Sequence, residues 1–285
     1  MRYRPTPAAS IDAWYQWHVT RRRRTARTVA RQASNSRPVR ALARAGLVAS
    51  AVIHIMIGVI AISVTNGLRQ RADQSGALKA IADTPGGVVL LWIAAGALIG
   101  LAVWQWTGPM AARPEGVAPN RIRDRFKSAG FLVVGLAAVV FAVGGRADTA
   151  EATRTFSSVL IDIPGGIFAL IALGIGVGAV GGAFVFRGVS RNFREDISPP
   201  DGAGGVAVVA LGVVGHTAKG VALIIVGALF VGSAVFADAS WASGLDGAVR
   251  FLAGLPTGLW PLFLVAGGLI AHGLYLTARA VVMRR

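Results

Sequence analysis

Residues 45–64 read AGLVASAVIHIMIGVIAISV, a run of twenty residues with one histidine and no charged side chain. The hydrocarbon core of a bilayer is about 30 Å thick, and a helix needs about 20 apolar residues to cross it. The run therefore predicts a membrane-spanning helix. Five more runs of this kind follow, and one of them is interrupted once, by Lys219. We expect six spans, at residues 45–64, 85–106, 128–145, 163–186, 202–237 and 256–278.

The composition of the whole chain agrees with this class of protein. Of 285 residues, 54% are apolar and 15% are charged, whereas about a quarter of the residues of a soluble domain are charged. We therefore expect an all-α polytopic membrane protein. The chain has no cysteine, which excludes disulfides, thiolate metal sites, iron–sulfur clusters and a cysteine nucleophile.

Basic residues are distributed unequally between the two sides of the membrane. The segments before the first span and after the second, fourth and sixth spans hold 11, 5, 3 and 3 basic residues, and the three alternate loops hold 3, 2 and 1. Cytoplasmic segments of membrane proteins carry an excess of Lys and Arg. We therefore expect both termini to be cytoplasmic.

Residues 1–44 form a basic arm, in which residues 18–32, HVTRRRRTARTVARQ, contain six arginines and no acid. Nucleic-acid binding would predict one basic arm, whereas the excess recurs on every segment of one side, so we expect no nucleic-acid partner. The preceding SIDAWYQWHVT is either a helix at the lipid headgroups or a solvated arm. Near anionic lipid of the inner leaflet each arginine contributes about 1 kcal/mol of attraction. The expected membrane-surface anchor is Arg21, Arg22, Arg23, Arg24, Arg27 and Arg31.

Small residues recur at steps of five and seven in the first helix of each pair of spans. This pattern predicts three repeats of two spans, at residues 45–109, 126–187 and 205–285. Each repeat enters the membrane from the same side, so the repeats are parallel. A compact threefold arrangement is the natural expectation, and a row of hairpins is the alternative. The recurring residues are Gly46, Ala51 and Gly58, then Gly130, Gly135 and Ala142, then Gly215, Gly220 and Gly227.

A short segment that leads into a proline lies on the outer side of each repeat. Its sequences are SGALKAIADTPGG, FSSVLIDIPGG and LDGAVRFLAGLPTG. Apolar residues three or four apart predict a short amphipathic helix at the outer surface, and an ordinary loop is the alternative. The prolines Pro85, Pro164 and Pro256 suit the first turn of the following span, where the missing N–H breaks no bond.

Glycines spaced one turn apart predict faces at which helix backbones approach each other closely in lipid. The fourth span has three such glycines and the second span has two. The expected packing glycines are Gly46, Gly58, Gly96, Gly100, Gly130, Gly135, Gly174, Gly178, Gly182, Gly215, Gly220 and Gly227.

Two stretches, ARAGLVASAVIHIMIGVIAI and GALKAIADTPGGVVLLWIAAGALIGLAVWQW, stand beside the threefold repetition as the chain's recognisable motifs. By these motifs the chain, from about Ala43 to the end, resembles a bacterial membrane family, frequent in actinobacteria, called domain of unknown function 1206. The second repeat, FKSAGFLVVGLAAVVF, departs most from the pattern because it lacks the Ala-Arg-Ala-Gly opening. The resemblance implies three two-helix repeats in a bacterial cell membrane, with no activity to transfer.

Four ionisable residues lie inside the expected spans, and such residues are candidates for function because burying them is costly. His54 is near the middle of the first span, and with Lys219 it is the candidate for a solute pathway. For Lys219 we prefer a side chain that extends to the inner surface. His216 and His272 lie at similar depth, so they are the candidate pair for haem or a metal ion. The simpler expectation is that each histidine bonds a neighbouring helix and that no cofactor or metal is bound.

No catalytic constellation is present, because the spans contain no acid pair, no phosphate-binding loop and no His-Glu-x-x-His motif. We therefore expect no enzyme. The leading hypothesis is a structural or accessory component that binds lipid, another membrane protein or a second copy of itself. The alternatives are a small-solute transporter or channel and, third, a haem- or metal-binding membrane protein.

Overall fold

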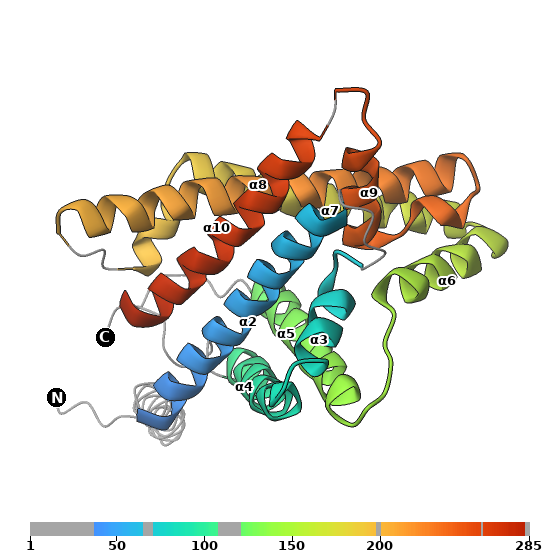
Figure 1. The fold of residues 1–285 in the computed structure, drawn as a ribbon. Helices are drawn as coiled ribbons and strands as arrows, with labels where there is room; N and C mark the ends of the chain where they lie inside the picture. The colour runs from blue at the N-terminus through green and yellow to red at the C-terminus, as the bar shows by residue number, and fades with distance from the viewer. Residues whose placement is uncertain (1–36, 65–70, 108–120, 198–200, 258, 283–285) are drawn as a thin grey trace, which may run out of the picture.

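The computed structural model describes residues 37–64, 71–107, 121–197, 201–257 and 259–282, and its regular elements are helices (Figure 1). The order of a long, a short and a long helix occurs three times. The long helices are α2 (Arg37–Ser63), α4 (Gly87–Thr107), α5 (Arg121–Ala142), α7 (Gly166–Val189), α8 (Ala203–Val235) and α10 (Trp260–Val282). The short ones are α3 (Gln74–Ala82), α6 (Thr149–Asp162), α9 (Gly244–Ala253) and the 3-10 turns η3 (Asn192–Asp196) and η4 (Ala239–Trp241).

The lengths and compositions of these helices confirm the expected all-α membrane class. In the described part, four helices are long and apolar enough to cross a bilayer, at Arg44–Ser63, Gly166–Val189, Ala203–Val235 and Trp260–Val282. Two further apolar stretches, Gly87–Val103 and Ser128–Ala142, are shorter. They are compatible with six spans, and the count of six stays a prediction.

The long helices of each expected repeat pack along those of the next (Figure 1). α7 lies along α8, α8 contacts α10, α10 lies along α2, and α2 contacts α4, which lies along α5. These contacts join the first expected repeat to the second, the second to the third and the third to the first, although α5 and α7 of the second repeat do not pack along each other in the described part. In Figure 1, α4 and α5 are viewed nearly end-on while α2, α8 and α10 run across the picture, so neighbouring pairs cross. All three pairs of expected repeats are therefore in contact, which disagrees with a row of hairpins, and the compact threefold arrangement stays a prediction.

The short helices also close a cycle, near their N-terminal ends, which we call the outer polar ring. Arg71, just before α3, pairs with Asp148, the N-cap of α6. Arg154 of α6 donates from Nε to the hydroxyl oxygen of Ser243, the N-cap of α9, at 3.1 Å. The ring closes where Asp246 of α9 accepts from the Ala72 N–H at 3.0 Å. Each contact therefore joins a different pair of short helices.

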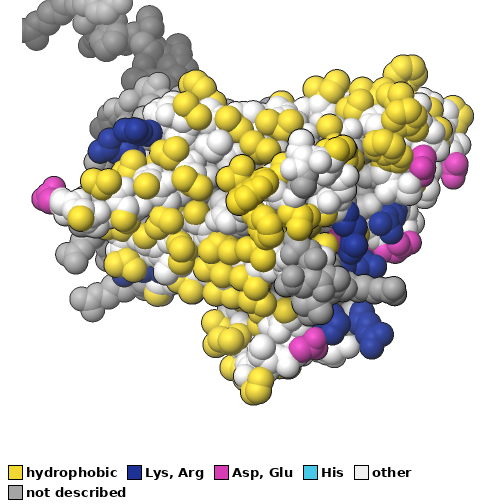
Figure 2. All heavy atoms as spheres, turned by 45° about the horizontal axis from the view of Figure 1, so that its top comes forward, with side chains coloured by type: hydrophobic (Ala, Val, Ile, Leu, Met, Phe, Trp, Pro, Cys, Tyr) yellow, Lys and Arg dark blue, Asp and Glu magenta, His cyan; other side chains and the backbone are white. Residues whose placement is uncertain are grey.

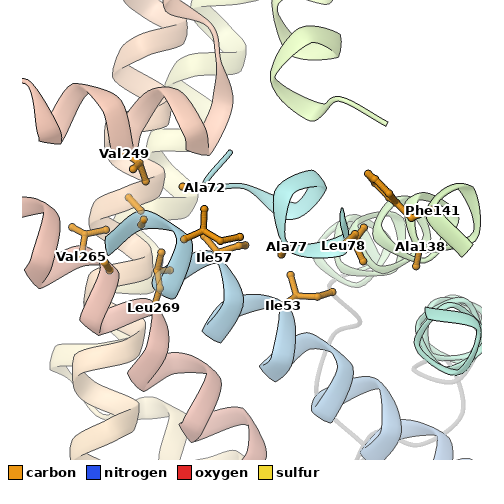
Figure 3. Close-up of a cluster of buried hydrophobic side chains, with 14 of the residues drawn as sticks. Ile53, Ile57, Ala72, Ala77, Leu78, Ala138, Phe141, Val249, Val265 and Leu269 are labelled. Atoms are coloured by element: carbon orange, nitrogen blue, oxygen red, sulfur yellow. The ribbon is translucent and has the colours of Figure 1, made fainter. Parts of the chain in front are cut away.

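The three outer segments are helices, as expected, but they are not all at the surface. The apolar stripes of α3 and α9 lie in the core, with Leu78, Val249 and Leu252 less than 5% exposed. Figure 3 shows how these stripes point toward side chains of α2, α5 and α10. The stripe of α6 is exposed, since Phe156 and Val159 are 52% and 54% accessible. Only α6 matches the expectation of an apolar face at the outer surface.

The prolines lie before the long helices and not in their first turns, so that expectation is wrong. After Pro85 and Pro164 come Gly86 and Gly165, which adopt φ of +77° and +79°, a left-handed conformation that favours glycine. A Cβ on the next glycine, Gly87 or Gly166, would collide with a carbonyl of the preceding short helix, at Ile81 and Leu160 respectively. The two glycines therefore make the turn, and the proline ends the segment before it. In the third copy the chain passes Pro256 before α10 begins at Trp260.

The most extensive helix contact, between α7 and α8, uses glycines seven residues apart. A Cβ on Gly174 would lie 2.7 Å from the carbonyl oxygen of Gly227, and one on Gly220 would lie 2.6 Å from that of Gly181. Gly181 did not belong to the expected set, which followed the four-residue spacing of Gly174, Gly178 and Gly182.

The other expected glycines divide into two groups. A Cβ would meet a neighbouring helix within 3 Å at Gly46, Gly58, Gly135 and Gly215. It would meet nothing within 4 Å at Gly96, Gly130, Gly178 or Gly182, although the backbone of Gly178 lies against Gly227. Gly96, Gly130 and Gly182 thus lie outside the close contacts, because their faces of the helices are exposed. Gly100 is partly buried.

The surface above α8 and α10 is mainly hydrophobic. Figure 2 shows a broad apolar face whose charged side chains gather at its margins. The exposed residues of these helices include Val206, Val214, Trp260 and Leu264. A soluble protein rarely exposes so large an apolar area, and lipid would cover it.

Gly220→Ala tests the contact between α7 and α8. The added methyl must push the backbones apart, and overpacking of this kind costs about 1–3 kcal/mol. We expect a lower midpoint of thermal unfolding in mild detergent. Gly182→Ala is the matched control, since its methyl meets nothing within 4 Å, and equal midpoints for the two variants would contradict the described contact.

Candidate functional site

The four ionisable residues expected inside the spans lie together where α2, α8 and α10 meet. The ammonium nitrogen of Lys219 lies 2.9 Å from Nε2 of His54. The ring centroid of His272 is 5.0 Å from that of His54 and 5.0 Å from that of His216. We call these four residues the histidine–lysine cluster. From the sequence we expected His54 and Lys219 in a solute pathway and the other two histidines as a cofactor pair. In the structure all four residues lie in one site.

Two close helix approaches bring the cluster together. His216 and Lys219 are three residues apart on α8 and therefore share a face. A Cβ on Gly215 would lie 2.5 Å from Cα of His272, so α10 lies directly against α8 at this level. A Cβ on Gly273 would lie 2.7 Å from the carbonyl oxygen of Ala51, so α10 also lies directly against α2. Small residues beside the histidines thus determine which helices meet.

The hydrogen bonds of two histidines define their tautomers. Nδ1 of His54 lies 2.7 Å from the carbonyl oxygen of Ser50, one turn earlier in α2. A carbonyl only accepts, so Nδ1 carries the proton, and Nε2 of the neutral ring accepts from Lys219. His216 bonds the carbonyl of Gly212 in the same way, at 2.7 Å. Its Nδ1 therefore also carries the proton.

Lys219 does not extend to the inner surface, which corrects the expectation for this side chain. Its ammonium lies against His54 and 5.2 Å from the ring centroid of Phe184 on α7. Among the described residues no carboxylate contacts it. The partners reach it from α2 and α7, so the side chain is held between helices. A cation over an aromatic face gains about 0.5–2 kcal/mol, which is less than an ion pair offers at this depth.

His272 is the most constrained member of the cluster. It is 3% exposed, and its Nδ1 has no hydrogen-bond partner among the described residues. A buried polar atom without a partner costs about 1–3 kcal/mol. A buried atom of this kind has room in its hydrogen bonding for a water or a ligand as partner.

Three aromatic residues that sequence reasoning did not identify surround the cluster. Phe193 of η3 is fully buried and stacks on His216, with centroids 5.0 Å apart and planes 11° apart. Tyr275 of α10 meets His216 edge-on at 5.0 Å, and Phe184 lies between Lys219 and His216. Signals for two of them exist in the sequence. Phe193 is a lone aromatic residue in the charged loop SRNFRED, and Tyr275 follows His272 by three residues.

The arrangement does not suit the expected cofactor pair. The rings of His216 and His272 meet edge to face, with planes 83° apart and centroids 5.0 Å apart. Two axial ligands of a haem must face each other across a planar macrocycle, and rings in direct contact leave no such space. No group of three His, Cys, Asp or Glu side chains in the described ranges could hold a metal ion. The arginines of the expected surface anchor, Arg21 to Arg31, lie outside the described residues.

The contact between His54 and Lys219 is testable by a double-mutant cycle. His54→Leu leaves the ammonium without its acceptor, so we expect a loss of about 1–3 kcal/mol in the free energy of unfolding. Lys219→Met with His54→Leu removes both polar partners and should recover most of that loss. Chemical unfolding in detergent of the wild type, both single variants and the double variant measures the coupling. Additive losses would contradict a direct contact.

Comparison with known proteins adds a family and one relative. Two regions of the chain, residues 45–107 and 214–282, match the family model described as Domain of Unknown Function (DUF1206). The chain is 24% identical over 250 residues to "Uncharacterized protein YxxB" of Bacillus subtilis (strain 168), covering 85% of this chain and 90% of that protein. No solved structure matches the chain. The first matched region contains His54 and the second contains the rest of the cluster, so the chain is similar to this family in the segments that form the cluster.

Proposed function

We propose that this membrane protein is a small-solute transporter or channel whose pathway passes the histidine–lysine cluster. The observation that carries the proposal is the convergence of four ionisable side chains from three helices. Ionisable residues within spans are rare because their burial is costly, and they mark solute, ion and proton pathways. From the sequence alone we preferred an accessory role. The convergence of the four ionisable side chains is the reason to propose transport instead.

The position of the cluster in the chain supports this class. α2 begins the first expected repeat, and α8 and α10 form the third, so the cluster lies between repeats. Transporters built from repeats place their substrate sites near the midplane at the interface between repeats. His54 lies near the middle of the first expected span. The same family model matches the first and the third repeat, which supports an internal repeat.

The chemistry of the cluster favours binding over catalysis. Imidazole and ammonium groups can hold and release a proton or an anion, whereas bond cleavage usually needs a paired base and nucleophile. Nothing of that kind accompanies the cluster in the described residues. We therefore propose a non-enzymatic role in the bacterial cell membrane.

The proposed orientation places both termini in the cytoplasm. The N-terminal end of α2 and the C-terminal end of α10 lie on the same side in Figure 1. The segments rich in arginine belong to that side by the positive-inside rule. The basic arm would then lie on anionic lipid of the inner leaflet.

An accessory role that binds lipid is the second candidate, and a groove between α8 and α10 favours it. The groove has a volume of about 440 Å³ and is lined by apolar side chains such as Val214, Val221, Leu264 and Val265. An acyl chain fits this lining. The groove also contains Thr217, whose buried hydroxyl has no partner among the described residues.

The transport proposal predicts flux through purified protein in liposomes. Across a panel of small ions and solutes we expect one class to cross, and His54→Ala should lower its rate about ten-fold, which corresponds to about 1.4 kcal/mol. Thr155→Ala, at an exposed position of α6, is the control and should keep the wild-type rate. Vesicles that stay sealed to the whole panel, together with lipid retained by the protein in native mass spectrometry, would favour the accessory role.

The proposed orientation predicts which introduced cysteines react from outside. The chain has no cysteine, so Thr155→Cys and Asn192→Cys each create one thiol at an exposed position. In intact cells an impermeant maleimide should label Thr155→Cys on the outer side and leave Asn192→Cys unlabelled until the membrane is opened. The reverse pattern would invert the orientation.

A further inference from the structure

We infer that the histidine–lysine cluster binds a single small inorganic anion of halide size, with Lys219 and His272 as its donors. The inference names the ligand class of the site described above, and it rests on the proposed function for that site. The first argument is charge balance. Lys219 brings a positive charge into the junction of α2, α8 and α10, and it contacts no carboxylate among the described residues.

An uncompensated charge inside a membrane protein is costly, and ionisable groups there pair with one another or with a ligand. His54 accepts one hydrogen bond from Lys219 but brings no negative charge. Arg187 and Arg279 lie close enough to act electrostatically on His216, and each has a partner of its own. They therefore add to the positive field around the cluster without balancing Lys219. A bound anion would supply the missing charge.

The second argument is the count of hydrogen-bond donors. An ammonium group has three N–H donors, and the contact with His54 uses one of those of Lys219. The contact with Phe184 is through the aromatic face and uses no acceptor lone pair. Nδ1 of His272 also has no partner, and a neutral imidazole can carry its proton at either nitrogen. The cluster thus holds unfilled donors on two helices, which is what an anion requires.

The third argument concerns size. The rings of His54, His216 and His272 are spaced by 5.0 Å, and Phe193 stacks on His216 at the same distance. Side chains this close together exclude an organic acid, so a ligand of the cluster must be a single small ion. The ammonium of Lys219 attracts an anion and repels a metal cation at the same place.

The test measures thermal unfolding of the full chain in detergent while chloride or bromide replaces gluconate at constant ionic strength. A ligand of the folded state raises the unfolding temperature in a saturable way, and we expect this for the wild type. Lys219→Met should raise the half-saturating halide concentration by about ten-fold or more. His272→Phe keeps the ring and removes Nδ1, so it should weaken the response without emptying the space. Thr155→Ala is the control and should respond as the wild type does.

The line width of the chloride NMR signal in the presence of wild type or variant gives a second readout that does not depend on unfolding. No saturable response in the wild type, or the same half-saturating concentration in Lys219→Met, would overturn the inference. A shift that follows pH and not halide would assign the cluster to protons instead. Halide binding without flux in liposomes would leave the inference standing and refute transport. Flux of another solute without halide binding would do the opposite.

Discussion

Close approach of helix backbones at small residues is the constraint on which the structure depends. Lipid is as apolar as the helix surfaces, so helices associate through packing and polar contacts and not through the hydrophobic effect. The contacts of Gly174 with Gly227 and of Gly220 with Gly181 hold α7 against α8. Those of Gly215 with His272 and of Gly273 with Ala51 hold α10 against both α8 and α2. Without these approaches the histidines and the lysine of the cluster would not meet.

Much of the fold could be predicted because its causes are local. The length of each apolar run determines the helices, and the three- and four-residue spacing of Leu78 and Ile81 predicts a short amphipathic helix in α3. Other features depend on which helices become neighbours, and a single sequence does not contain that information. The pairing of Lys219 with His54 is one example, since the two residues are 165 positions apart. The burial of α3 and α9, against the exposure of α6, is another.

The sequence predicted which ionisable residues belong to the candidate site, but not how they are arranged. The four candidates could be found because ionisable residues are rare inside an apolar helix. They are His54, His216, Lys219 and His272. Depth also separated His54 from the other histidines, and this separation was wrong because crossing helices bring different depths together. Phe193 was missed because it belongs to a loop, where sequence patterns carry little information about burial. Its position against His216 places a loop segment in direct contact with the cluster.

The outer polar ring gives the protein a kind of redundancy. Three contacts join three short helices in a cycle, and a cycle of three remains connected when any one of its links is broken. Opening the contact between Arg154 and Ser243 would leave α6 tied to α3 and α3 tied to α9. A single broken contact therefore does not free any of the three short helices from the other two.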